Sequence, residues 1–144
     1  MITPLDAFAL ATAALFLKMF GLGLMQGAMR KKHNTFAKPE DAEVYGSGEV
    51  ADAELPIVDR AQRTLRNDLE NIPIFLFLAW CYIELNIWPT GAGIYFAIFV
   101  ASRFAHTTFY LKPTQPYRTI SYSIGGLVCL ALTGHIGYAV LLAP

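Results

Sequence analysis

Four long apolar blocks limit what this chain can fold into. They are separated by polar segments and lie at about residues 7–29, 72–88, 91–111 and 119–143. A transmembrane helix needs roughly 20 mostly apolar residues, and three of the blocks reach that length outright. Because lipid offers the backbone no hydrogen-bond partners, helices are the structure that such blocks favour. We therefore predict an all-α integral membrane protein, a bundle of four transmembrane helices.

The second block continues directly from a charged segment. The run "RTLRNDLENIPIFLFLAW" at 63–80 passes from charged to apolar with no turn signal between the two halves. This helix reaches a spanning length only if its charged start, back to about Asn67, dips below the lipid headgroups. Only 15% of the residues are charged, against about 25% in a typical soluble domain. We predict a single domain, residues 1–144, with helices at about 6–30, 57–86, 90–111 and 117–142.

The basic residues predict the orientation in the membrane. Lys and Arg concentrate between the first and second predicted helices and between the third and fourth. The connection "ELNIWPTG" has none, and neither do residues 1–17 or 119–144. The positive-inside rule then places both basic loops in the cytoplasm and both termini on the opposite side. The sequence contains no soluble domain with a basic stripe of the kind that binds nucleic acid.

Several single features outside the helix pattern also carry expectations. We predict that about residues 34–55 form a long irregular loop, either a binding element or an acidic linker. We interpret Cys81 and Cys129 as small buried hydrophobic residues, and we expect no disulfide or metal site. Lys18 interrupts the first apolar block, and we expect a carboxylate partner across the bundle, with Asp68 and Glu84 both as candidates.

Polar side chains recur at helical spacing at the basic end of three predicted helices. They are Arg63, Arg66, Asn67 and Glu70 on the second helix, Arg103, His106 and Tyr110 on the third, and Arg118, Thr119 and Tyr122 on the fourth. An ionisable group inside a membrane segment costs at least ~2.5–3.5 kcal/mol and usually faces a cavity or a partner. Two interpretations stay open: these residues hold the bundle together, or they form a pocket for a small zwitterion with several carboxylates. For Arg60 and Lys112 the simpler interpretation is contact with lipid headgroups.

Four motifs together resemble the MAPEG superfamily, the membrane-associated proteins in eicosanoid and glutathione metabolism. They are "FAKPEDA" at 36–42, "RTLRNDLENI" at 63–72, "RFAHTTFYL" at 103–111 and "PYRTISY" at 116–122. The pattern is similar to the branch of microsomal glutathione transferases and microsomal prostaglandin E synthases, rather than to the leukotriene C4 synthase branch. The resemblance implies a homotrimer of four-helix subunits, with one glutathione at each subunit interface near the cytoplasmic face.

The resemblance also implies roles for individual residues. Arg66, Asn67 and Glu70 would hold the peptide of glutathione, and His106 and Tyr110 would add contacts. The thiol would be surrounded by Arg118, Thr119 and Tyr122, of which Arg118 and Thr119 would be catalytic. The glutathione carboxylates would be contacted by Arg63 and by Arg30, the latter from the neighbouring subunit. Asp41 matches a family aspartate near the active site, and Thr119 stands where relatives carry Ser or Ala.

The activity that follows from the resemblance is that of a detoxifying glutathione transferase. Such an enzyme would activate glutathione, its co-substrate, as a thiolate and add it to lipophilic electrophiles dissolved in the membrane lipid. Glutathione peroxidase activity toward a lipid hydroperoxide is a further expectation. The alternative is a non-catalytic membrane scaffold or lipid-binding protein of the same fold, and a small channel or transporter is a third.

Overall fold

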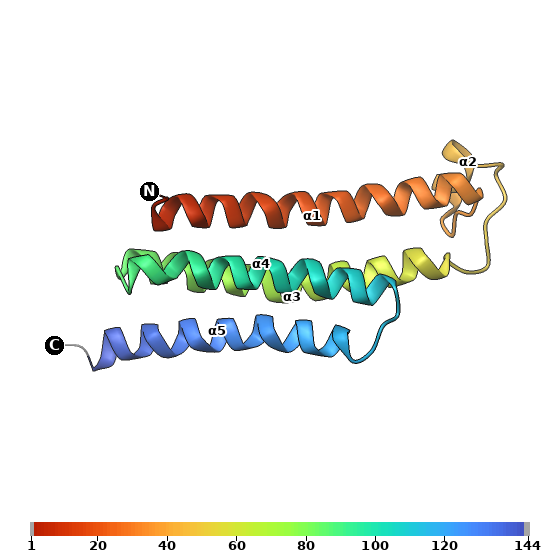
Figure 1. The fold of residues 1–144 in the computed structure, drawn as a ribbon. Helices are drawn as coiled ribbons and strands as arrows, with labels where there is room; N and C mark the ends of the chain where they lie inside the picture. Colours follow the sequence, from red (N-terminus) through yellow and green to blue (C-terminus); the bar gives the residue numbers. More distant parts are fainter. Residues whose placement is uncertain (1, 143–144) are drawn as a thin grey trace.

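The computed structural model describes residues 2–142, which form four long helices and one short one (Figure 1). The helices are α1 (Pro4–His33), α2 (Pro39–Tyr45), α3 (Pro56–Glu84), α4 (Pro89–Leu111) and α5 (Tyr117–Leu141). The first four begin with a proline, whose missing N–H would have had no partner in the first turn of a helix. The long helices lie close to the predicted ranges, and α3 continues through Pro73.

The long helices pack in three layers. Figure 1 shows α3 and α4 side by side in the middle, with α1 on one side of them and α5 on the other. The core between the layers is aromatic, and the stacked rings of Phe75 and Phe99 have their centroids 3.8 Å apart. Leu15 from α1 and Leu132 from α5 close this core from its two sides. Within one chain, α1 and α5 are therefore separated by the central pair.

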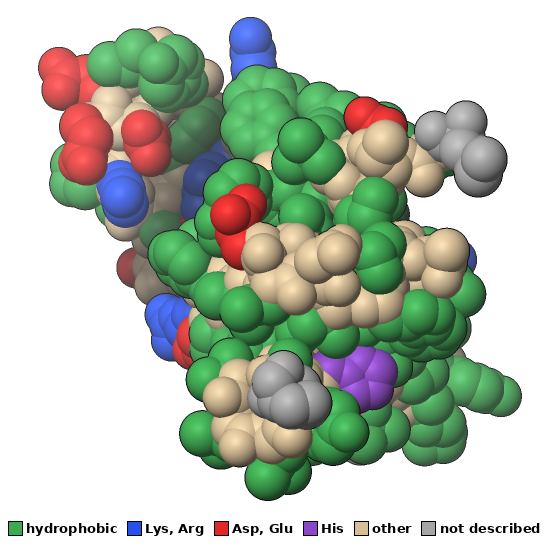
Figure 2. Space-filling view, turned by 90° about the vertical axis from the view of Figure 1, so that its left-hand side faces the viewer, with side chains coloured by type: hydrophobic (Ala, Val, Ile, Leu, Met, Phe, Trp, Pro, Cys, Tyr) green, Lys and Arg blue, Asp and Glu red, His purple; other side chains and the backbone are tan. Residues whose placement is uncertain are grey.

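The two ends of the bundle differ in charge. One end, here called the basic end, holds α2, the last turns of α1 and α4 and the first turns of α3 and α5 (Figure 1). The other end, here called the terminal end, holds both chain termini and the turn between α3 and α4. Figure 2 looks onto the terminal end, which presents mostly hydrophobic and uncharged side chains, with a few acids and, toward the top and left of the view, some Lys and Arg. The Lys and Arg residues that predicted the orientation thus gather at the opposite end.

The outside of the bundle is apolar. Large hydrophobic side chains are exposed on each long helix, including Phe16 and Phe20 on α1, Phe77 on α3, Ile94 on α4 and Leu130 on α5. Exposed apolar surface of this extent is typical of contact with lipid or with another chain. By length and composition, α1 and α5 are the two described helices that could cross a membrane. The other two long helices, α3 and α4, do not meet the same criterion, so their membrane crossing stays a prediction.

Two predictions about local structure were wrong. The segment at 34–55 is not wholly irregular, because it contains α2, whose Ala42 is buried together with Phe36. Two acids in the first turn of α2 complement the positive end of its helix dipole. Cys81 is exposed on α3, while Cys129 is half-buried, and both are free thiols. Cys81 therefore lies on the outward face of α3, although its neighbours Ala79 and Tyr82 belong to the core.

A buried ion pair joins α1 to α3. Lys18 Nζ pairs with Asp68 Oδ2, and both side chains are almost completely shielded from solvent. Of the two carboxylates that the sequence offered, Asp68 is the partner, while Glu84 is exposed near the terminal end. A matched pair of this kind avoids the cost of an isolated charge in the low-dielectric interior. The pair explains why a lysine can stand in the middle of an apolar helix.

Candidate functional site

A polar cavity lies at the basic end, where α3, α4 and α5 meet. Its volume is about 290 Å³, and it is lined by Pro56, Asp59, Arg60, Arg63, Tyr110 and Arg118. Three of these residues, Arg63, Tyr110 and Arg118, were predicted for the site from their helix faces. Three arginines against a single aspartate give the cavity a positive balance, and guanidinium groups bind carboxylates in a bidentate manner. The cavity is suited to a small ligand with more than one carboxylate.

Arg118 is held in a fixed position by its neighbours. Its guanidinium carbon lies 4.8 Å from the centre of the Tyr110 ring, a cation–π arrangement. The Gln115 amide is oriented with its nitrogen toward the Thr119 hydroxyl and its oxygen toward Arg118. In this orientation the oxygen accepts hydrogen bonds from Arg118 Nε (3.2 Å) and Nη2 (2.7 Å). The backbone carbonyl of Arg118 accepts a hydrogen bond from His106 Nδ1 at 3.2 Å. An arginine fixed in this way loses little side-chain entropy when it binds an anion.

His106 packs against two aromatic residues of the site. Its ring centroid lies 5.7 Å from that of Tyr110 and 5.9 Å from that of Tyr122. His106 is buried, whereas the two tyrosines are partly open to the outside. The structure thus brings two further predicted residues, His106 and Tyr122, together beside Tyr110 and Arg118. Within one chain, Tyr122 does not line the cavity, and its ring packs against His106.

Arg103 is a residue of this region that the sequence analysis left without a role. It is 0% exposed, and its Nη1 donates a hydrogen bond to Asn67 Oδ1 at 3.0 Å. Its guanidinium also lies over the Tyr122 ring at 5.6 Å. A Cβ atom at Gly125 would come within 3.1 Å of Arg103 Nη2, so the glycine leaves room for the guanidinium. Arg103 therefore fixes the amide of Asn67, a predicted glutathione contact.

The remaining predicted residues do not join the cavity within one chain. Arg66 and Glu70 are exposed on α3, and neither makes a side-chain hydrogen bond or ion pair with the residues that the structure describes. Thr119 is also exposed, and its hydroxyl pairs with the Gln115 amide. Arg30 lies on α1, on the far side of the central pair, and borders a separate hollow of about 250 Å³ together with Asp41.

Two lining residues, Asp59 and Arg60, were missed as site residues. Arg60 was interpreted as a headgroup contact because it stands near the start of the helix. Its spacing of three residues from Arg63 places both side chains on one helical face, and both line the cavity. The same spacing argument that selected Arg63 could have selected Arg60. Asp59 gave a weaker signal, since its four-residue spacing to Arg63 also fits an ordinary surface ion pair, which the structure contains at 3.1 Å.

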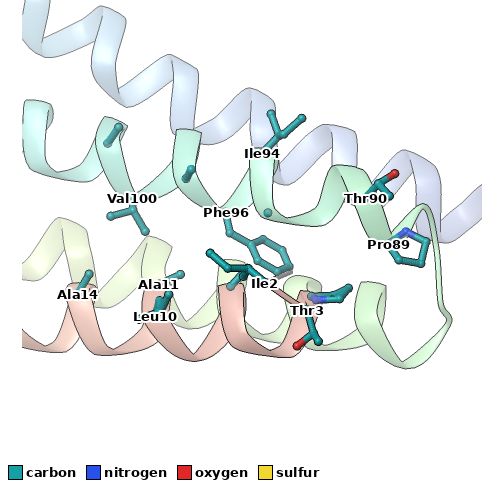
Figure 3. Close-up of a pocket in the computed structure, with 15 residues that line it drawn as sticks. Ile2, Thr3, Leu10, Ala11, Ala14, Pro89, Thr90, Ile94, Phe96 and Val100 are labelled. Atoms are coloured by element: carbon teal, nitrogen blue, oxygen red, sulfur yellow. The ribbon is translucent and has the colours of Figure 1, made fainter.

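A second and larger hollow lies at the terminal end. This apolar groove has a volume of about 650 Å³ and runs between the first half of α1 and the first half of α4 (Figure 3). Its walls are small or apolar side chains, among them Ala7, Ala11, Ala14, Gly93 and Ala97. Thr3 and Thr90 are the two lining residues with polar side chains. None of the predicted site residues borders this groove.

Comparison with known proteins agrees with the motifs. The sequence profile of the MAPEG family matches residues 8–138. The chain is 36% identical to the prostaglandin E synthase of Homo sapiens over 133 residues, which cover 92% of this chain and 87% of that protein. It is also 36% identical to the microsomal glutathione S-transferase 1 of Homo sapiens over 130 residues, or 88% of this chain and 84% of that protein. These findings confirm the predicted resemblance, and the chain belongs to the MAPEG family.

Proposed function

We propose that this protein is a membrane-bound glutathione transferase that adds glutathione to lipophilic electrophiles. The observation that carries the proposal is the positively charged cavity in which Arg118 is held against Tyr110 and Gln115. Glutathione carries two carboxylates and one ammonium group. The donor set fits this ligand, because the three arginines match the carboxylates and Asp59 matches the ammonium. Two relatives, named prostaglandin E synthase and microsomal glutathione S-transferase, support the same class of reaction.

The proposed catalytic role of Arg118 is electrostatic. Bound glutathione supplies a thiol, whose ordinary pKa is about 8.5 and which reacts as the thiolate. An adjacent guanidinium remains protonated at any relevant pH and favours the anion. Lowering the pKa of the thiol by two units requires about 2.7 kcal/mol of differential stabilisation. Arg118 would supply most of it, with the hydroxyl of Thr119 or Tyr122 as a further hydrogen-bond donor.

The complete site requires more than one copy of the chain. Arg30 on α1 and Arg118 on α5 lie on opposite sides of the α3–α4 pair, so Arg30 would reach a glutathione at α5 only from a neighbouring subunit. Arg66 and Glu70 are exposed on α3, where such a neighbour could meet them. On α1, a Cβ atom at Gly23 or Gly27 would meet nothing within 4 Å, which leaves a small-residue face open for close helix packing. We propose a homotrimer, as the family resemblance implies.

The membrane setting would deliver the two reactants from different phases. The proposed orientation places the basic end at the cytoplasmic surface, where soluble glutathione enters the cavity. The electrophile partitions into the hydrocarbon and arrives between the helices. A lipid hydroperoxide would arrive by the same route, so we include peroxidase activity in the proposal. The residues that line the cavity are matched to glutathione and do not indicate which electrophile is used.

The decisive experiment is the ultraviolet difference spectrum of the glutathione thiolate in detergent-purified protein, wild type beside Arg118→Ala. The wild type should show a glutathione-dependent thiolate signal, and the variant should lose it while remaining folded and self-associated. Lys112→Ala is the matched control, because Lys112 is a neighbouring cation that is exposed and outside the cavity. An equal signal in wild type and Arg118→Ala would reject the catalytic role of Arg118.

A second candidate function is that of a non-catalytic lipid-binding protein or scaffold. The apolar groove between α1 and α4 favours it, because a lipid chain could lie along such walls. The same spectrum separates the two candidates. A well-folded wild type that shows no thiolate signal and no binding of glutathione would make the second candidate the better description of the protein.

A further inference from the structure

The carboxylate of Glu54 engages Arg30 at the basic end. Glu54 Oε2 accepts hydrogen bonds from Arg30 Nε at 2.9 Å and from Arg30 Nη2 at 2.6 Å. The side chains are 22% exposed for Arg30 and 18% for Glu54, so the pair is mostly shielded from water. The two residues are 24 positions apart and tie the end of α1 to the start of α3. This contact is not explained by the bundle core, which lies further along both helices.

Glu54 is itself fixed by other groups. Its Oε1 accepts the backbone N–H of Leu55 at 3.1 Å, and Leu55 is the residue that caps the start of α3. Its Oε2 also accepts a hydrogen bond from Gln62 Nε2 at 3.4 Å. The carboxylate is thus held through both of its oxygens, with three donors on Oε2 and one on Oε1. Glu54 is therefore a fixed support for Arg30 and not a mobile group that an incoming anion would displace.

The geometry leaves part of the Arg30 guanidinium available. Glu54 takes one edge of the fork, Nε and Nη2, through a single oxygen. Of the five N–H donors of an arginine, those on Nη1 and the second one on Nη2 remain for another acceptor. An arginine held along one edge offers the other edge at a defined angle, which is the geometry that a second carboxylate needs for bidentate binding. Arg30 is therefore preorganised as well as paired.

We infer that Glu54 is a positioning residue that orients Arg30 toward a carboxylate of the glutathione bound by the neighbouring subunit. This inference rests on the proposed function, in which Arg30 supplies such a contact. Because Glu54 already balances the charge of Arg30, the contact contributes direction more than net charge. The benefit comes from preorganisation, since the side chain of Arg30 is ordered before the ligand arrives.

The test is the dissociation constant of glutathione, measured by calorimetry on the detergent-purified full chain, for wild type and Glu54→Gln. Glutamine keeps the size of the side chain and one acceptor oxygen but loses the charge-assisted pair with Arg30. The dissociation constant should rise about fivefold, while turnover at saturating glutathione should stay within about twofold of wild type. Glu49→Gln is the matched control, because Glu49 is an exposed acid of the same loop. It should leave the dissociation constant unchanged.

A variant with the two charges exchanged distinguishes a role in positioning Arg30 from a role in holding α1 and α3 together. The double variant Arg30→Glu with Glu54→Arg keeps an ion pair between α1 and α3, so its unfolding temperature should stay near that of wild type. It presents a carboxylate to the ligand, so its affinity for glutathione should fall at least tenfold. Wild-type affinity in this double variant would show that the pair only fastens the helices, and would overturn the inference.

Glutathione analogues add a readout that a purely structural role would not move. The two probes are glutathione with its glycine carboxylate converted to an amide, and cysteinylglycine, which lacks the γ-glutamyl carboxylate. One of the two should bind equally to wild type and to Glu54→Gln, because it lacks the carboxylate that Arg30 contacts. Tighter glutathione binding by Glu54→Gln, or an unchanged affinity, would overturn the inference while the proposed function stands. Absence of glutathione binding to wild type would overturn both.

Discussion

The polar cavity at the basic end and the apolar groove at the terminal end have opposite characters. The groove is the larger, at about 650 Å³ against about 290 Å³. Yet the groove is walled by alanine, glycine and aliphatic side chains, whereas the cavity is walled by three arginines, an aspartate and a tyrosine. Apolar walls exclude water without directing a reaction, while positioned charges select a ligand and stabilise developing charge. The smaller hollow is therefore the better candidate for chemistry.

The difference between the ends has its origin in the way each end is built. At the basic end, buried Arg103 and the Lys18–Asp68 pair carry charge into the bundle behind the cavity. At the terminal end, the polar contacts lie near the surface or join single side chains, such as the Thr3–Asp6 capping box at the start of α1 and the hydrogen bond between Tyr82 Oη and His135 Nδ1 at 3.0 Å. Four substitutions test this contrast, from the largest expected effect to the smallest.

The largest effect is expected from Lys18→Met. Methionine fills similar space but leaves the Asp68 charge buried without a partner, which should lower the free energy of unfolding by about 3–5 kcal/mol. Chemical unfolding in detergent measures the loss. Lys18→Met combined with Asp68→Leu should recover part of the stability, because both charges of the pair are then removed while buried Arg103 loses a nearby counter-charge. A single variant as stable as wild type would show that the charge behind the cavity is not buried as described.

Arg63→Ala should affect the ligand more than the fold. The Arg63 side chain is 63% exposed, and its surface pair with Asp59 contributes little to stability. Because Arg63 lines the cavity, its loss should weaken glutathione binding about tenfold, the cost of one charge-assisted hydrogen bond. Titration calorimetry measures the affinity, and Lys31→Ala serves as a control for a general change in charge. Unchanged affinity would place glutathione elsewhere.

Tyr82→Phe tests the terminal end. It removes the hydroxyl that pairs with His135, and the free energy of unfolding should fall by about 1 kcal/mol. Glutathione affinity should not change, because Tyr82 lies at the opposite end of α3 from the cavity. Tyr138→Phe, at an exposed tyrosine, should have no effect on either quantity. A change in glutathione affinity with Tyr82→Phe would mean that the two ends are coupled.

The smallest effect is expected from Ala97→Leu, which fills part of the groove. Ala97 is exposed and faces the open space between α1 and α4, so a leucine should fit without strain. The glutathione dissociation constant and the thiolate signal should stay within measurement error of wild type. A loss of either would show that the groove contributes to the glutathione chemistry, and the contrast between the two hollows would no longer hold.

The helix positions could be predicted because apolar block length and proline placement are local signals. The seven-residue helix α2 was missed, since it is too short for its periodicity to be recognised, although Pro39 and two following acids mark its start. The faces that carry Arg63, Tyr110 and Arg118 were also predictable, because spacing along one helix decides them. The prediction that these helix faces meet in one site came from the four motifs of the family resemblance.

Contacts between distant segments could not be predicted in the same way. The choice between Asp68 and Glu84 as the partner of Lys18 depends on the axial offset of α1 and α3, which no local pattern encodes. The pairing of Glu54 with Arg30 depends on how a 22-residue connection from Asn34 to Leu55 returns to the bundle. In the proposed homotrimer, the surroundings of Arg66 and Glu70 would depend on a second copy of the chain. Each of these contacts requires packing information that lies outside a single helix.

The Lys18–Asp68 pair also has a consequence for the order in which the protein is assembled. A chain emerges from the ribosome from its N-terminus, so if α1 and α3 cross the membrane as predicted, α1 enters the bilayer before α3 exists. Until then, Lys18 is an unmatched cation in an otherwise apolar helix, at a cost of at least ~2.5 kcal/mol on insertion scales. The arrival of Asp68 removes that cost at one axial offset only, because a shift of one helical turn separates the charges by about 5.4 Å. The pair thus favours one register of the two helices after insertion. The free-energy cost of Lys18 in α1 is removed only when α3 packs against α1 at the axial offset that brings Asp68 to Lys18.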